Sequence, residues 1–157
     1  MTSDLHGRHA LVTGAAGGIG EACARRLASL GARVTVADVD GDGAARVADE
    51  LGGRAWVVDL ADTESLEDVE LDDVDILVNN AGVQRIHPVH EFPPDEWRWM
   101  QRLMVESPFL LARAVLPGMH ERGWGRIVNI SRRTACGRRR TRAPTSRPST
   151  GWRGSRR

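Results

Sequence analysis

A glycine-rich stretch near the start of the chain restricts the possible fold more than any other feature. The stretch VTGAAGGIG follows a short apolar run, and a helical pattern begins within it. Gly14, Gly18 and Gly20 would let the backbone turn tightly and approach a pyrophosphate, and the start of the helix would supply free N–H donors. Since strand, turn and helix are predicted in this order, the stretch indicates a dinucleotide-binding loop; a plain glycine-rich turn is the alternative.

Short apolar runs alternate with helical patterns over most of the chain. We expect strands at 9–12, 34–37, 55–58, 75–78 and 126–130, and helices at 19–30, 43–51, 63–69 and 95–119. The strands are continuous apolar runs, which is typical of a parallel sheet covered by helices on both faces. The pattern predicts an α/β fold with a doubly wound Rossmann-type sheet of about five strands. Asp95 is expected to cap the longest helix, and Pro108 to bend it.

Asp38 ends the second predicted strand, 18 residues after Gly20. A carboxylate at this position can accept hydrogen bonds from both ribose hydroxyls of the cofactor and would repel a 2′-phosphate. No arginine lies between Gly14 and Gly20 or directly after Asp38. These observations favour NAD over NADP as the cofactor, and an ordinary exposed loop aspartate is the alternative.

The charged residues divide the chain into two parts. All 22 basic residues are arginine, and the sequence contains no lysine and no tyrosine. Residues 1–131 carry 12 arginines and 21 acidic residues, a formal charge of −9, whereas residues 132–157 carry 10 arginines and no acidic residue. We therefore expect one NAD-binding domain at 1–131 and a disordered basic tail at 132–157. A nucleic-acid-binding tail is an alternative, but Trp152 is its one aromatic residue and it has no helical pattern.

The cellular setting is predicted from three absences. Cys23 and Cys136 are the only cysteines and form no disulfide framework, which fits a reducing compartment. Residues 1–8 are polar, unlike a signal peptide, and no apolar run is long enough to cross a bilayer. We expect a cytoplasmic protein with no membrane partner and no metal site.

Five motifs in order, TGAAGGIG, ADVD, VVDL, ILVNNAG and GRIVNIS, cover about residues 5–131 and resemble the short-chain dehydrogenase/reductase family. The resemblance implies an oxidoreductase that binds NAD(H) or NADP(H). It also implies that Ala16 and Ile19 join the glycines at the cofactor and that Asp59 and Leu60 border the adenine. The remaining cofactor-binding positions implied by the resemblance follow the fourth strand and are Asn80, Ala81 and Gly82.

Three further segments, NNAGVQ, HEFPPDEW and LPGMHERGWGRIVNIS, resemble the 3-hydroxybutyrate dehydrogenase branch of that family. The resemblance implies that Gln84 binds the substrate carboxylate, which an amide N–H₂ can do; a polar loop residue is the alternative. His87 and His90 are interpreted as solvated loop residues. For an intact member of the branch, the resemblance implies a homotetramer that oxidises 3-hydroxybutyrate to acetoacetate.

The catalytic residues of the family are missing from this chain. The family uses a tyrosine for proton transfer, a lysine four residues later that lowers the tyrosine pKa, and a serine thirteen residues before the tyrosine. The serine position holds Arg132, one residue after Ser131, and Met104 stands where the family usually has an asparagine. We therefore predict no catalytic residue and no activity in this chain; a non-catalytic NAD-binding protein is the alternative.

A slip of the reading frame near residue 131 would explain this loss. In the shifted frame, each new codon consists of the last base of one codon and the first two bases of the next. With suitable synonymous codons at some positions, codons 131–156 then encode the amino-acid sequence SAHGLRASAYKGAYVTAKHGLEGLS. A tyrosine then stands opposite Thr145 and a lysine opposite Ser149, four residues apart as the family requires. Without the lost segment, we expect an unpaired edge on the fifth strand, exposed apolar surface and poor solubility.

Overall fold

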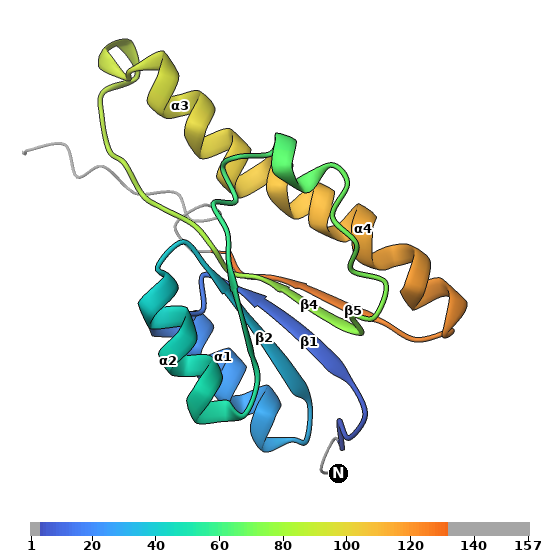
Figure 1. The fold of residues 1–157 in the computed structure, drawn as a ribbon. Helices are drawn as coiled ribbons and strands as arrows, with labels where there is room; N and C mark the ends of the chain where they lie inside the picture. The colour runs from blue at the N-terminus through green and yellow to red at the C-terminus, as the bar shows by residue number, and fades with distance from the viewer. Residues whose placement is uncertain (1–3, 132–157) are drawn as a thin grey trace, which may run out of the picture.

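The computed structural model describes residues 4–131 and contains one parallel sheet of five strands (Figure 1). The strand order is β3-β2-β1-β4-β5, and all four neighbouring pairs are parallel. The strands are β1 (His9–Thr13), β2 (Arg33–Asp38), β3 (Arg54–Val57), β4 (Ile76–Asn79) and β5 (Arg126–Asn129). The predicted Rossmann-type sheet of five strands is therefore confirmed. The predictions for residues 132–157 lie outside the described residues.

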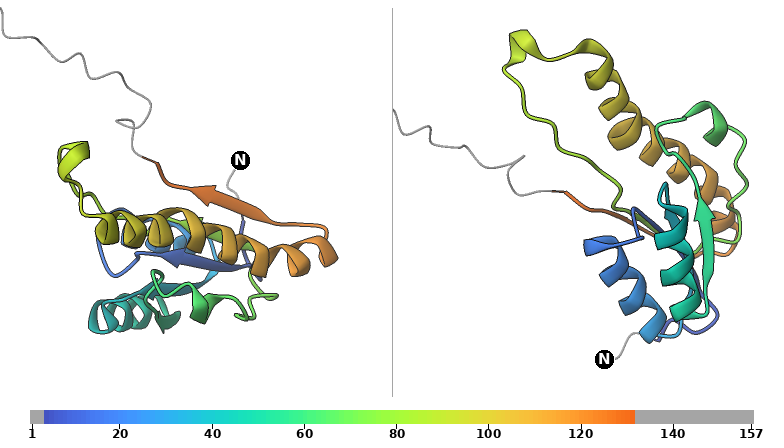
Figure 2. Two further views of the ribbon diagram at one scale, coloured as in Figure 1. Left: turned by 90° about the horizontal axis from the view of Figure 1, so that it is seen from above. Right: turned by 60° about the vertical axis from the view of Figure 1, so that its left-hand side comes forward.

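Helices cover both faces of the sheet. Helices α1 (Gly18–Ser29) and α2 (Gly41–Leu51) lie on one face, and α4 (Ser107–Glu121) lies on the other (Figures 1 and 2). Helix α3 (Pro94–Gln101) continues into α4 through a π-helical turn at Arg102–Glu106 and projects beyond the carboxyl ends of the strands. Two short 3₁₀ turns complete the described part, η1 (Glu64–Leu66) and η2 (Val89–Glu91).

The apolar core forms two layers, one on each face of the sheet. Alternate residues of the central strand β1 contribute to the two layers: Ala10 and Val12 face α1 and α2, whereas Leu11 faces α4. The first layer also contains Ala24, Val34, Val36, Ala44 and Val47, and the second contains Leu66, Leu77, Leu111, Val115 and Met119. This arrangement explains why the strands are continuous apolar runs, because both sides of each central strand are covered.

Strand β5 forms one edge of the described sheet and is much less buried. Its residues are all exposed, with Ile127 at 37% and Val128 at 44% of their full accessibility. Within residues 4–131 it pairs with β4 alone. For the described part of the chain, the expected open edge and exposed apolar side chains of the fifth strand are observed.

Two local predictions need correction. The expected helix at 63–69 is only the 3₁₀ turn η1, because this acidic segment buries a single large apolar side chain, Leu66. Asp95 is not the N-cap of α3: the helix begins at Pro94, and Asp95 lies in its first turn, paired with Arg98. The bend expected at Pro108 stays a prediction; the helix has a π-helical turn at Arg102–Glu106, just before this residue.

Candidate functional site

The glycine-rich loop lies at the carboxyl end of β1, where only glycine fits at three positions. Gly14 and Gly18 have φ values of +63° and +58°, which L side chains rarely adopt. A Cβ atom at Gly20 would lie 2.1 Å from the carbonyl oxygen of Gly14, and one at Gly14 would lie 2.8 Å from Cα of Ala81. The loop is therefore folded tightly against itself and against the segment after β4.

Helix α1 begins at this loop without a side-chain cap. Its N-cap residue is Gly17, which has extended backbone and makes no side-chain hydrogen bond. The N–H groups of a first helical turn have no partner inside the helix and carry partial positive charge, so they can bind an anionic group. Ile19 in the first turn is 64% exposed. The loop and the helix start together fit the pyrophosphate of a dinucleotide.

Thr13 and Asn80 fasten the loop to the fourth strand. The Thr13 hydroxyl oxygen accepts hydrogen bonds from the backbone N–H groups of Asn80 at 3.0 Å and Ala81 at 3.1 Å. The Asn80 side-chain amide donates to the carbonyl oxygens of Thr13 at 2.9 Å and Gly14 at 3.0 Å. The side chain of Asn80, which was expected along the cofactor, thus holds the backbone of the glycine-rich loop.

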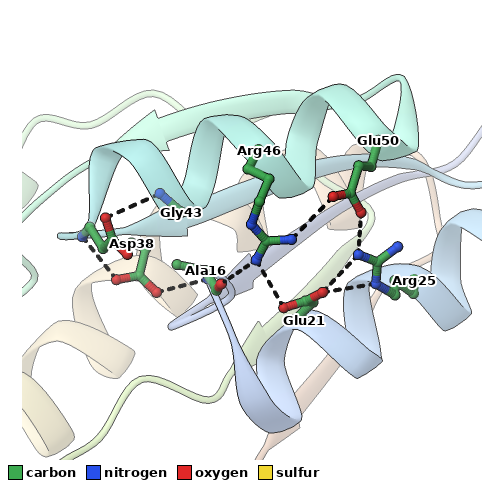
Figure 3. A network of polar contacts seen from close by, with 8 residues as sticks. Ala16, Glu21, Arg25, Asp38, Gly43, Arg46 and Glu50 are labelled. Atoms are coloured by element: carbon green, nitrogen blue, oxygen red, sulfur yellow. Dashed lines mark hydrogen bonds and ion pairs between the residues drawn. The ribbon is translucent and has the colours of Figure 1, made fainter.

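Asp38 lies half-buried at the end of β2 and is hydrogen-bonded to the glycine-rich loop (Figure 3). Its Oδ2 accepts from the N–H of Ala16 at 2.9 Å, and its Oδ1 accepts from the N–H of Asp40 at 3.1 Å. Two backbone donors therefore fix the orientation of the carboxylate. Each of its oxygens keeps a second acceptor position, so the group could also receive ribose hydroxyls.

Arg46 reaches the loop from α2, a contact that the sequence analysis missed. Its guanidinium donates to the carbonyl oxygen of Ala16 at 3.1 Å and contacts Glu21 and Glu50, each at 3.2 Å (Figure 3). Arg25 contacts the same two glutamates. Hydrogen bonds from Arg25 and then Arg46 lower the pKa of both Glu21 and Glu50. The available signal was a pair of i,i+4 charge patterns, Glu21 with Arg25 and Arg46 with Glu50.

The other predicted residues have different surroundings. Asp59 is exposed and accepts a hydrogen bond from the N–H of Ala61, whereas the side chain of Leu60 is buried in the core layer under α4. Gly82 is exposed, and a Cβ atom there would lie 3.7 Å from Sδ of Met104 in the π-helical turn. Gln84 is exposed in the segment that follows.

The two loop histidines differ from each other. His90 is 80% exposed, as expected for a solvated residue. His87 is packed edge-on against Phe92, with ring centroids 4.9 Å apart, and its Nε2 lies 2.9 Å from a carboxylate oxygen of Glu96. His87 is nevertheless exposed, as expected for a solvated loop residue, and its two contacts connect it to the end of η2 and to α3.

Residues 4–131 contain neither a candidate metal site nor a candidate membrane span. These residues contain no group of three or more His, Cys, Asp and Glu arranged to hold a metal ion. No helix in this part of the chain is long and apolar enough to cross a membrane.

Comparison with known proteins decides the family. The model of the short chain dehydrogenase family matches residues 8–140. This chain is a short-chain dehydrogenase family member. The match runs past residue 131, where the sequence resemblance was expected to end, and its last nine residues lie outside the described part.

Similar proteins of this family differ in the substrates that they are named for. A D-threitol dehydrogenase of Mycolicibacterium smegmatis is 39% identical over 83% of this chain and 55% of its own length. A D-beta-hydroxybutyrate dehydrogenase of Cupriavidus necator is 35% identical over 81% of this chain and 54% of its own length. The chain thus spans about half the length of these curated relatives. A solved metagenomic short-chain oxidoreductase in complex with NADP is 38% identical, with a TM-score of 0.74, over 81% of this chain and 62% of that one.

Proposed function

We propose that the carboxyl end of the sheet binds NAD(H). The observation that carries this proposal is that α1 begins at the glycine-rich loop without a side-chain cap. The loop is so tightly folded that a side chain at Gly20 would clash with the Gly14 carbonyl. On this proposal, the pyrophosphate lies at Gly14–Gly20 and the exposed side chain of Ile19 packs against the cofactor. The adenine borders Asp59 and Leu60. Because the Leu60 side chain is buried, its backbone would make the contact. Ala81 and Gly82 lie further along the cofactor.

Asp38 makes NAD the expected cofactor in place of NADP. Its carboxylate is oriented by two backbone N–H groups and carries a negative charge that opposes a 2′-phosphate. A related structure contains NADP, so the preference needs a direct test. Titration of the purified chain with NADH and NADPH should show tighter binding of NADH, and Asp38→Asn should reduce the difference. Equal binding by the unmodified chain would contradict the proposed preference.

We propose that this chain does not catalyse the family's reaction. Bound NAD would supply a hydride acceptor, but a residue of this chain would have to move the hydroxyl proton. The sequence has no tyrosine or lysine to do so, and Met104, next to Gly82, offers an apolar thioether where the family usually has an amide. Absorbance at 340 nm should stay constant when the chain is incubated with NAD and 3-hydroxybutyrate. Sustained NADH formation by the pure chain would overturn the proposal.

A short 3-hydroxy acid is the proposed substrate class of the intact enzyme. The resemblance of NNAGVQ and the similar D-beta-hydroxybutyrate dehydrogenase support it, and the exposed Gln84 would donate to the substrate carboxylate. The similar D-threitol dehydrogenase favours a neutral polyol instead. Binding separates the two without turnover: acetoacetate should bind the NADH-loaded chain, Gln84→Ala should weaken it, and D-threitol should not compete. Competition by D-threitol alone would favour the polyol.

The tail at 132–157 is proposed to be an out-of-frame product of the gene. The support is the abrupt change from 21 acidic residues before position 132 to none after it, together with the tyrosine and lysine that the shifted frame permits. Sequencing codons 125–160 should show a one-base slip near codon 131. An unbroken frame would contradict this explanation and would favour the Arg-rich tail as a genuine segment, for which nucleic-acid binding could then be measured at two salt concentrations.

A homotetramer is the proposed assembly of the intact enzyme. Val105, Phe109 and Leu116 are 59%, 64% and 40% exposed and lie at helical spacing along the outer side of the π-helical turn and α4. Exposed apolar patches of this kind commonly mark protein interfaces. Light scattering of the protein made from a repaired gene should give four chains per particle, and a monomer would contradict the proposal.

A further inference from the structure

We propose that Arg46 is a positioning residue for the adenosine side of the cofactor site, acting on Asp38 through the backbone of Ala16. The inference rests on the proposed binding of NAD(H) at the glycine-rich loop. Arg46 lies on α2, and it is 30 residues away from Ala16 in the sequence. Its guanidinium nevertheless donates to the Ala16 carbonyl oxygen at 3.1 Å.

The Ala16 residue is held on three sides. Its carbonyl accepts from Arg46, its N–H donates to Asp38 Oδ2 at 2.9 Å, and its side chain lies against Gly43 at the start of α2 (Figure 3). A Cβ atom on Gly43 would lie only 2.8 Å from Cβ of Ala16, so the helix approaches the loop as closely as a glycine allows. Two adjacent peptide units, joined at Cα of Ala16, therefore link the glycine-rich loop, the end of β2 and the first turns of α2.

The orientation of Asp38 depends on this link. Of the two backbone N–H groups that fix its carboxylate, the one from Asp40 is local, and the one from Ala16 comes from the loop. Rotation of the peptide between residues 15 and 16, which carries the Ala16 N–H, would remove the second donor and let the carboxylate turn away from a ribose. Arg46 opposes that rotation because it holds the carbonyl of the next peptide and so restrains the Ala16 backbone between the two.

Arg46 is itself held in place by charge. Its guanidinium bridges Glu21 on α1 and Glu50 on α2, each at 3.2 Å, and both ion pairs favour the position from which it reaches the loop. Arg25 bridges the same two carboxylates but makes no hydrogen bond to the loop among the described residues. Arg25 therefore gives a matched control, since its loss removes comparable surface ion pairs and leaves the contacts of the Ala16 backbone unchanged.

The test compares Arg46→Met with Arg25→Met in the full-length chain. Titration calorimetry with ADP-ribose, which lacks the nicotinamide, reports the adenosine side directly. Arg46→Met should raise the dissociation constant about fivefold or more, as expected for the loss of one oriented hydrogen bond, and Arg25→Met should change it less than about twofold. Hydrogen exchange of the Ala16 amide, measured by NMR without ligand, should become faster in Arg46→Met and not in Arg25→Met. Both variants should have similar melting temperatures.

The possible failures are distinguishable. Equal affinities of the two variants, or unchanged exchange of the Ala16 amide in Arg46→Met, would overturn the positioning role while leaving the cofactor site intact. Absence of ADP-ribose binding by the unmodified chain would instead contradict the proposed function, and the positioning role with it.

Discussion

The central strand β1 and the edge strand β5 belong to one sheet but are stabilised in different ways. Every residue of β1 is buried, and Leu11 at its centre has no exposed surface. Every residue of β5 is exposed. Polar contacts hold the chain near the amino end of this strand: Arg122 donates a hydrogen bond to Asp75, and the Arg126 guanidinium lies over the ring of Trp124. The central strand is therefore held by apolar packing, whereas polar contacts hold the amino end of the edge strand.

The largest expected effect comes from truncating one apolar residue in each strand. Leu11→Ala should lower the free energy of unfolding by about 2–5 kcal/mol, because it leaves a cavity in a fully packed layer. Ile127→Ala should lower it by about 1 kcal/mol or less, because the side chain is already partly exposed. Urea denaturation of both variants measures the difference. Equal losses would show that β5 is packed as firmly as β1.

Asp75 tests the polar contacts at the amino end of β5. Its side chain is 6% exposed and accepts hydrogen bonds from the His9 N–H at 3.0 Å and from Arg122 Nε at 2.9 Å. Asp75→Asn should cost about 3 kcal/mol, because the arginine is left without its buried partner. Asp95→Asn, which removes an exposed pair, should cost less than about 0.5 kcal/mol. Equal losses of unfolding free energy for the two variants in urea denaturation would show that the buried pair contributes no more to stability than the exposed pair.

The same residue predicts behaviour in acid. Burial raises the pKa of Asp75, but the His9 N–H bond and the hydrogen bond and charge of Arg122 outweigh it, so the pKa lies below its usual value. Its contribution to stability should therefore be complete above the ordinary carboxyl pKa and be lost as the pH falls through the lower folded value. Asp75→Asn should flatten that acid limb of the stability curve. If the loss of stability in acid is the same in Asp75→Asn, other carboxylates must cause the acid unfolding.

A smaller effect is expected at the N-cap of α2, on the tightly packed side. The Asp40 side chain accepts from the N–H of Gly43 at 3.1 Å. Asp40→Ala should lower the free energy of unfolding by about 1 kcal/mol through loss of this cap. Asp42→Asn, in the same helical turn, should lower it by only a few tenths of a kcal/mol through the helix dipole. Thermal unfolding of the two variants separates capping from charge.

The smallest predicted effect concerns pH near neutrality. His9 begins β1 and is buried, with Nε2 2.8 Å from the Thr35 hydroxyl; burial lowers its pKa more than the nearby Asp73 raises it. Below its ordinary pKa of 6.5 the unfolded chain therefore binds more protons, so stability should fall as the pH drops from 7.5 toward 5.5. His9→Gln should make that slope shallower, and the exposed control His120→Gln should not. A steeper dependence of stability on pH in His9→Gln would contradict a lowered pKa of His9 in the folded chain.

The local elements were predictable because their signals are local. The five apolar runs locate all five strands to within two residues, and the glycine spacing at Gly14–Gly20 locates the loop where only glycine fits. The helix predicted at 63–69 failed because its charged residues give no apolar face, and only one turn forms around Leu66.

The contacts that join distant elements could not be predicted in this way. Arg46 meets Ala16 only because α2 packs across the loop, and nothing in the 30 intervening residues indicates that approach. Asp75 was similarly expected only as the first residue of the strand at 75–78, yet the fold places it in a buried position beside Arg122. Both cases involve charged side chains whose partners are set by topology and not by spacing.

Amide hydrogen exchange of the full-length chain with and without NADH tests the central claim most directly. The account predicts added protection at Gly14–Gly20 and at the end of β2 around Asp38, and no change in β5. Protection confined to other segments, or none at saturating NADH, would contradict a cofactor site at the glycine-rich loop.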